Sequence, residues 1–143
     1  MSWIHLYSSM EFVVFDPIPL AKAFACLFFA ILFIQSGLDK VTDRKGNLDY
    51  LTEHFANSPL KGQVPMMLGT MTVVELVTGA CNFGGIFGAF FEPMQILTVL
   101  GPALACVSFL MLFFGQRIAK DYAGAASLAT YFVVALVALY LNK

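Results

Sequence analysis

Long apolar runs that are nearly free of charged side chains dominate this chain. A helix needs roughly 20 apolar residues to cross a bilayer core of about 30 Å. The runs are continuous and do not alternate polar with apolar residues, so they do not fit the strand pattern of a membrane barrel. We therefore predict an all-α membrane protein, a four-transmembrane-helix bundle forming a single domain over residues 1–143, with spans near 18–38, 64–91, 94–115 and 121–141.

The composition excludes other classes of protein. Hydrophobic residues make up 59% of the chain and charged residues 12%, whereas soluble domains average roughly 45–50% and about 25%. Too little polar surface remains for a water-soluble enzyme, and the apolar content excludes a disordered chain. The net charge of −1 excludes a polybasic nucleic-acid binder, which needs clustered basic side chains to neutralise phosphates.

Local signals predict where the spans begin, end and bend. Residues 92–93 (Glu-Pro) are expected to form the turn before the third span, and Asp121 to cap the N-terminus of the fourth. The second run, 64–91, is longer than one bilayer thickness, so it either tilts or breaks near residues 82–85. Pro102 lies inside the third span, where a proline kinks a helix.

The distribution of basic residues predicts the orientation. The positive-inside rule places segment 39–62 in the cytoplasm and both termini outside, and residues 1–17 read as an aromatic, interfacial lead-in. Lys22 either pairs with Asn82 in the outer half of the membrane or extends to the surface. The basic residues assigned to the cytoplasmic side are Lys40, Arg44, Lys45, Lys61, Arg117 and Lys120.

Glu75 is the most informative single residue. It lies ten residues after Pro65, which places it about 15 Å into the membrane. An ionisable group at that depth marks a functional site by default. Two interpretations remain open: a carboxyl group that exchanges protons or binds a quinone headgroup, and a neutral glutamic acid that joins two helices by hydrogen bonds.

The same depth arithmetic selects neighbours for Glu75. Tyr131, with Thr130 beside it, lies at a similar depth and would meet Glu75 if the second and fourth spans touch. Thr72 and Asn82 share a helical face with Glu75. We expect this polar stripe to face the bundle interior.

Small residues predict close helix packing. Gly84 and Gly88 form a G-x-x-x-G pair, and Gly124 lies among the small residues that open the fourth span. They serve either packing within the bundle or docking of another subunit.

The sequence shows no ligands for a redox cofactor or a metal within the spans. His5 and His54 lie outside every span, so an intramembrane haem held by paired histidines is excluded. The three cysteines form no cluster that would hold zinc or iron–sulfur. We expect no cofactor other than a bound quinone or lipid.

Three motifs carry a family resemblance. Residues 33–41 read FIQSGLDKV, residues 54–60 read HFANSPL and residues 115–126 read GQRIAKDYAGAA, with Glu75 in a T-x-x-E-x-x-x-G setting. Together they resemble the DoxX family of small four-helix bacterial membrane proteins. The resemblance implies the bacterial inner membrane and a likeness to the membrane subunit of thiosulfate:quinone oxidoreductases.

The resemblance also points to a group of positions at the end of the first span. Gly37 is expected to end that helix. Asp39 and Lys40 are expected at the membrane surface, where they bind an anion or a partner or form a solvated helix end. The positions that match the family pattern are Ser36, Gly37, Asp39, Lys40 and Glu75, and the first four form a candidate surface site for an anion or a partner.

These observations lead to a functional hypothesis with two alternatives. We expect a small accessory or anchor subunit of a membrane-bound oxidoreductase or respiratory assembly, shaping a quinone-accessible pocket around Glu75 and Tyr131 and not catalysing alone. The alternatives are a small proton or solute transporter that uses Glu75, and a purely structural subunit. The expected partners are the lipid bilayer and other membrane subunits or further copies of the chain, and no nucleic acid.

Overall fold

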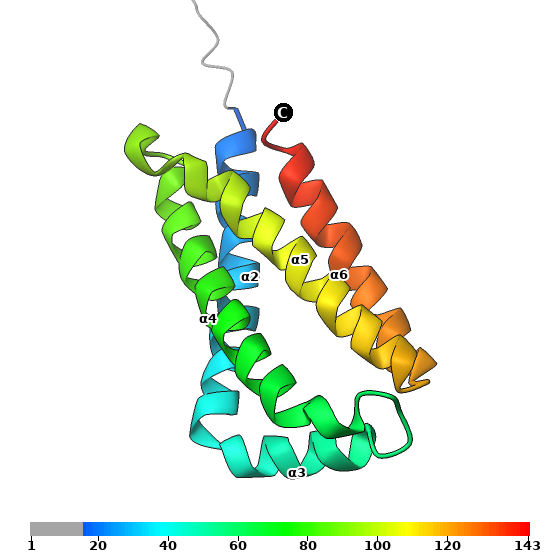
Figure 1. Ribbon diagram of the computed structural model, residues 1–143. Helices are drawn as coiled ribbons and strands as arrows, with labels where there is room; N and C mark the ends of the chain where they lie inside the picture. The colour runs from blue at the N-terminus through cyan, green and yellow to red at the C-terminus, as the bar shows by residue number, and fades with distance from the viewer. Residues whose placement is uncertain (1–15) are drawn as a thin grey trace, which may run out of the picture.

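The computed structural model describes residues 16–143 as four long helices and three short ones, with no strand in that range (Figure 1). This confirms the predicted all-α fold. All four long helices are long and apolar enough to cross a membrane. The expected aromatic lead-in lies almost entirely outside the described residues. The long helices are α2 (Ile18–Thr42), α4 (Val64–Gly88), α5 (Ile96–Ile118) and α6 (Tyr122–Tyr140).

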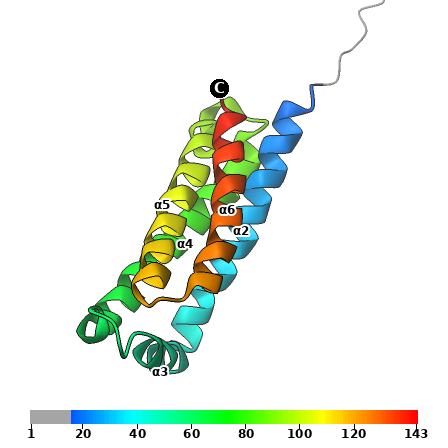
Figure 2. The same ribbon diagram turned by 90° about the vertical axis from the view of Figure 1, so that its right-hand side faces the viewer.

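The short elements are α3 (Arg44–His54), η1 (Lys61–Gln63) and η2 (Glu92–Met94). Helix α3 lies across the end of the bundle where α2 and α5 finish and α4 and α6 begin (Figures 1 and 2). Asp43 caps α3, because its side chain accepts a hydrogen bond from the Gly46 amide at 3.1 Å. The segment between the first two spans is thus partly a charged helix.

The first span corrects one expectation. Helix α2 continues to Thr42, so the prediction that Gly37 ends this helix is wrong. Gly37 lies inside α2, where a Cβ atom would come within 2.6 Å of Leu76 Cδ2 on α4. The glycine therefore allows a close helix crossing, and nothing in its backbone stops the helix.

Helix α4 resolves the two alternatives for the long second run. It is continuous to Gly88, so the break near 82–85 does not occur, and α4 runs at an inclination to α2 (Figure 1). Gly85 serves packing: a Cβ atom there would lie 2.7 Å from Cys26 Sγ and 3.0 Å from the Leu97 carbonyl oxygen.

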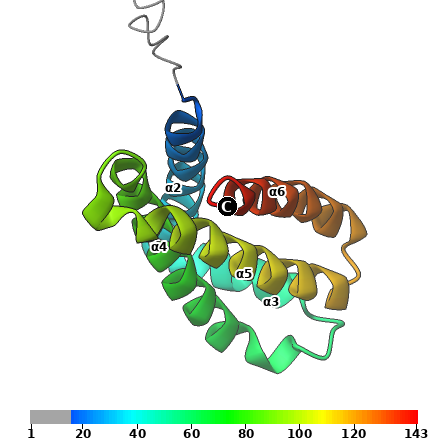
Figure 3. The same cartoon turned by 90° about the horizontal axis from the view of Figure 1, so that it is seen from above.

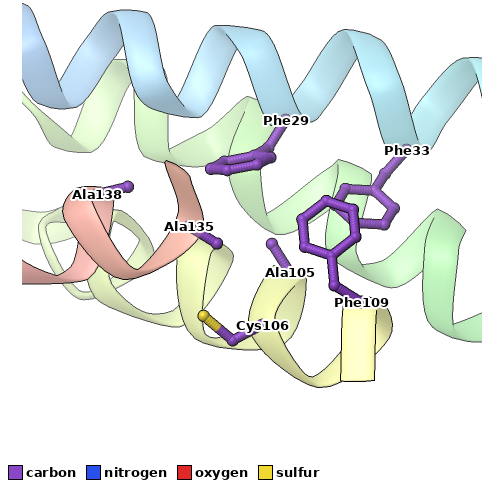
Figure 4. Packing of buried hydrophobic residues seen from close by; sticks show 7 residues of the cluster. All are labelled: Phe29, Phe33, Ala105, Cys106, Phe109, Ala135 and Ala138. Carbon is purple, nitrogen blue, oxygen red and sulfur yellow. The ribbon is translucent and has the colours of Figure 1, made fainter. Parts of the chain in front are cut away.

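Helix α5 lies between α4 and α6 when the bundle is viewed from above (Figure 3). Aromatic side chains of α2 and α5 meet at the centre, where the Phe33 and Phe109 ring centroids are 5.1 Å apart. The buried cluster in Figure 4 consists of Phe29, Phe33, Ala105, Cys106, Phe109, Ala135 and Ala138.

Helix α5 runs through Pro102, which has no N–H to donate to the carbonyl four residues earlier, that of Thr98. The Asn142 side-chain amide donates to this oxygen at 2.9 Å. In return the Thr98 hydroxyl donates to Asn142 Oδ1 at 2.6 Å. These two bonds fasten the end of α6 to the start of α5.

The expected cap of α6 is present, because the Gly124 amide donates to Asp121 Oδ1 at 2.8 Å. Lys120, just before the cap, has a φ of 62°, and this left-handed residue turns the chain from α5 into α6.

Candidate intramembrane polar site and adjoining cavity

Glu75 is 1% exposed in the bundle interior and is bound by two side chains of α2. Lys40 Nζ lies 2.8 Å from its Oε2 atom, and the Ser36 hydroxyl donates to the same oxygen at 3.0 Å. Lys40 Nζ also donates to Ser36 Oγ at 2.8 Å. The structure thus joins the expected mid-membrane carboxylate to two residues that the sequence had placed at the surface.

The direction of the Lys40 side chain explains this contact. Cα–Cβ bonds in a helix point toward its N-terminus, and Lys40 lies in the last turn of α2. Its side chain therefore extends back over Ser36, one turn earlier, toward the membrane interior. Lys22 lies near the other end of the same helix, where the same rule points a side chain outward. No hydrogen bond joins Lys22 to Asn82 among the described residues.

Two glycines bring α2 and α4 close enough for the short Ser36 side chain to reach Glu75. Gly37 contacts Leu76, as described above. Gly79, one turn after Glu75, would place a Cβ atom 2.9 Å from the Ile34 amide nitrogen. Larger side chains at these positions would push the helices apart and lengthen the bonds to Glu75.

The rest of the polar stripe on α4 is also buried. Thr72 donates to its own helix at the Leu68 carbonyl, at 2.6 Å. The Asn82 amide nitrogen donates to the Thr78 carbonyl at 2.8 Å, and its Oδ1 atom has no hydrogen-bond partner within residues 16–143. That oxygen lies against Gly101 of α5.

Tyr131 and Thr130 are not partners of Glu75 in the structure. The ring of Tyr131 stacks on Phe109, with centroids 5.7 Å apart, and Thr130 is exposed on α6. Helix α6 packs on the far side of α5 from α4 (Figure 3), so residues expected at the same depth on these two helices do not meet.

A cavity of about 340 Å³ lies between α3, the start of α4 and the end of α5; we call it the α3 cavity. Its lining is almost entirely apolar, with methionines on two walls. The hydrogen bond between His54 Nε2 and Gln116 Oε1, at 2.8 Å, fastens α3 to α5 at its edge. The lining includes Lys40, Tyr50, His54, Met66, Met67, Met71, Met111 and Gln116.

One signal of this cavity in the sequence was overlooked. Met66, Met67 and Met71 are spaced along the start of α4, and flexible thioether side chains are typical of adaptable binding surfaces.

A second, more open hollow of about 510 Å³ lies between α2 and α6; we call it the α2–α6 cleft. Ser36, Asp39 and Tyr131 line it. Asp39 is exposed and accepts a hydrogen bond from the Asn47 amide at 3.3 Å, so it stays at the surface while Lys40 turns inward.

The predicted packing glycines serve contacts within the chain. A Cβ atom on Gly84 would meet Leu97 Cδ1 at 2.5 Å, and one on Gly88 would collide with the Met94 carbonyl. Gly124 lies against the Asp121 carboxylate that caps α6.

The fold and the site together define a four-helix membrane bundle with a buried ion pair beside an apolar cavity. Comparison with models of known protein families, with curated proteins and with solved structures found no match in any of the three. The likeness to the DoxX family therefore stays an interpretation of the sequence motifs.

Proposed function

We propose that this protein is a small accessory or anchor subunit of a membrane-bound oxidoreductase or respiratory assembly, and that it holds a quinone in the α3 cavity. The observation that carries the proposal is the cavity itself. Its volume of about 340 Å³ lies within the range of small-molecule sites, about 300–1,000 Å³, which are mostly apolar with a few placed polar groups.

The position of the cavity supports a ligand that arrives from the bilayer. It lies beside α3, whose four charged side chains suit a membrane surface, and between apolar walls formed by α4 and α5. A quinone combines a polar headgroup with an apolar tail, so it can place its headgroup at this depth. In this proposal the cavity faces the cytoplasm of a bacterial cell, following the basic residues, and the redox group belongs to a partner subunit.

The test is mild-detergent affinity purification from native membranes, with mass spectrometry of the bound proteins and of the extracted quinone. Met71→Trp fills the cavity, and we expect it to lower the amount of quinone per protein at least fivefold. Val73→Trp is the matched control, because Val73 lies two residues away on the same helix but is exposed. Wild-type protein that carries neither quinone nor oxidoreductase subunits would refute the proposal.

A second candidate, proton or solute transport, is favoured by one observation. Lys40 lines the α3 cavity and Ser36 lines the α2–α6 cleft, and the Lys40 ammonium donates a hydrogen bond of 2.8 Å to the Ser36 hydroxyl. Transport by the purified protein in proteoliposomes should then be lost in Glu75→Gln. Equal fluxes in wild type and variant would refute this candidate.

A further inference from the structure

The ammonium group of Lys40 makes two short contacts and one long one, and the long one can be exchanged for a ligand. A lysine carries three N–H donors. Ser36 Oγ and Glu75 Oε2 each lie 2.8 Å from Nζ, and the third donor makes only a long hydrogen bond of 3.4 Å to the Ser36 carbonyl, weaker than one in the usual range of about 2.7–3.2 Å. Lys40 also lines the α3 cavity, so a molecule bound there whose acceptor reaches Nζ would replace this long contact with a shorter hydrogen bond.

The positive charge of the Lys40 ammonium is balanced by the Glu75 carboxylate. Among the described residues that line the cavity, Lys40 is the one with a formal charge at neutral pH, taking His54 as neutral. Glu75 lies just behind it, with a side chain that is only 2% exposed. A negative group placed near Nζ would be attracted by Lys40 and repelled by Glu75, so it would gain little from the charges while losing its hydration. An uncharged acceptor loses much less hydration.

We propose that the Lys40–Glu75 pair makes the α3 cavity selective for an uncharged amphiphile with a hydrogen-bond acceptor, such as a quinone carbonyl, over an anionic amphiphile such as a fatty acid. Lys40 is the donor to the ligand. Glu75 is a positioning residue that orients the ammonium and sets the net charge of the site to zero. This inference rests on the proposed function, because it assumes that the cavity holds a ligand.

The experiment measures the binding of two probes with the same tail length, decylubiquinone and decanoate, to the purified full chain by equilibrium dialysis. We expect wild type to bind the quinone at least tenfold more tightly. Glu75→Gln leaves the positive charge of Lys40 without its counter-charge. The affinity for decanoate should then rise about tenfold, and the preference for the quinone over decanoate should narrow or reverse. Lys40→Met should lower the affinity for the quinone about tenfold without raising the affinity for decanoate.

The change in preference separates this role from a structural one. Loss of helix packing would weaken the binding of both probes together, whereas the proposal requires tighter binding of decanoate in Glu75→Gln. If that variant does not fold, the double variant Lys40→Met, Glu75→Gln removes both charges, and it should bind the quinone weakly without gaining decanoate. An unchanged preference in Glu75→Gln, equal affinities in wild type, or full quinone affinity in the double variant would overturn the inference.

The failure of the proposed function has a different outcome. In that case wild type would bind no quinone, or Met71→Trp would bind it as well as wild type does. If Met71→Trp blocks quinone binding but Glu75→Gln leaves the preference between the two probes unchanged, only the inferred selectivity is refuted.

Discussion

Nζ of Lys40 lies 2.8 Å from Oε2 of Glu75, so a lysine in the last turn of one span neutralises a carboxylate in the middle of the next. Each charge alone would be costly in the membrane interior. The pair therefore links the packing of α2 on α4 to the polarity of the α3 cavity.

Replacing Lys40 by methionine should destabilise the bundle by about 3–5 kcal/mol, because a buried carboxylate loses its counter-charge. The measurement is unfolding in mixed micelles with increasing SDS. The double variant Lys40→Met, Glu75→Leu should lose less stability than Lys40→Met alone. A double variant with the full sum of both single losses would contradict a direct interaction. Lys61→Met, at an exposed position, is the control.

Gly79→Ala should lower stability by about 1–3 kcal/mol, because its methyl group would collide with Ile34 where α2 crosses α4. Gly69→Ala on the same helix is the matched control: its Cβ atom would have only Arg44 Nη2 nearby, at 4.0 Å. The same SDS titration compares the two variants. Equal stabilities would show that the crossing is looser than the structure describes.

Asn142→Leu should cost about 1–3 kcal/mol, because the Thr98 carbonyl that Pro102 leaves unpaired loses its donor. Hydrogen exchange should increase at the C-terminal end of α6. Asn142→Asp keeps an acceptor for the Thr98 hydroxyl but removes the donor, so an intermediate loss is expected. Protection equal to wild type in Asn142→Leu would rule out this clamp.

His54→Ala should release α3 from α5, because it removes the hydrogen bond to Gln116. Such a bond is worth about 1 kcal/mol, which corresponds to about fivefold faster exchange of the α3 amides. Thr52→Ala is the control, since the Thr52 hydroxyl bonds only within α3, to the Leu48 carbonyl. Equal exchange in the two variants would mean that other contacts hold α3 in place.

The sequence predicted the spans well, because the absence of charge over about 20 residues is a local property that any bilayer-crossing helix needs. The Asp121 cap was predicted for the same reason: a cap depends only on the next three residues. The extension of α2 to Thr42 was missed because a glycine was interpreted without its neighbour. Only the contact between Gly37 and Leu76, on another helix, shows what that glycine does.

The residues of the candidate site were predicted, but the contacts between them were not. Burial of Glu75 and of its polar stripe follows from the helical period, and residues 36–40 were selected by the family resemblance. Their meeting was not predicted, because depth arithmetic gives the level of a residue in the membrane but not which helices touch. Tyr131 was assigned to Glu75 for that reason. The bond between Thr98 and Asn142 likewise joins the start of α5 to the end of α6, which no local pattern indicates.

The Lys40–Glu75 pair also bears on the order of membrane insertion. Both residues lie in the first two spans, and chains emerge from the ribosome at about 5–20 residues per second. The helical hairpin of α2 and α4 can therefore neutralise its own intramembrane charges while residues 96–140 are still being synthesised. Helix α5 then packs an apolar surface, which includes Phe109, against this hairpin. The ion pair can therefore form before α5 and α6 enter the membrane.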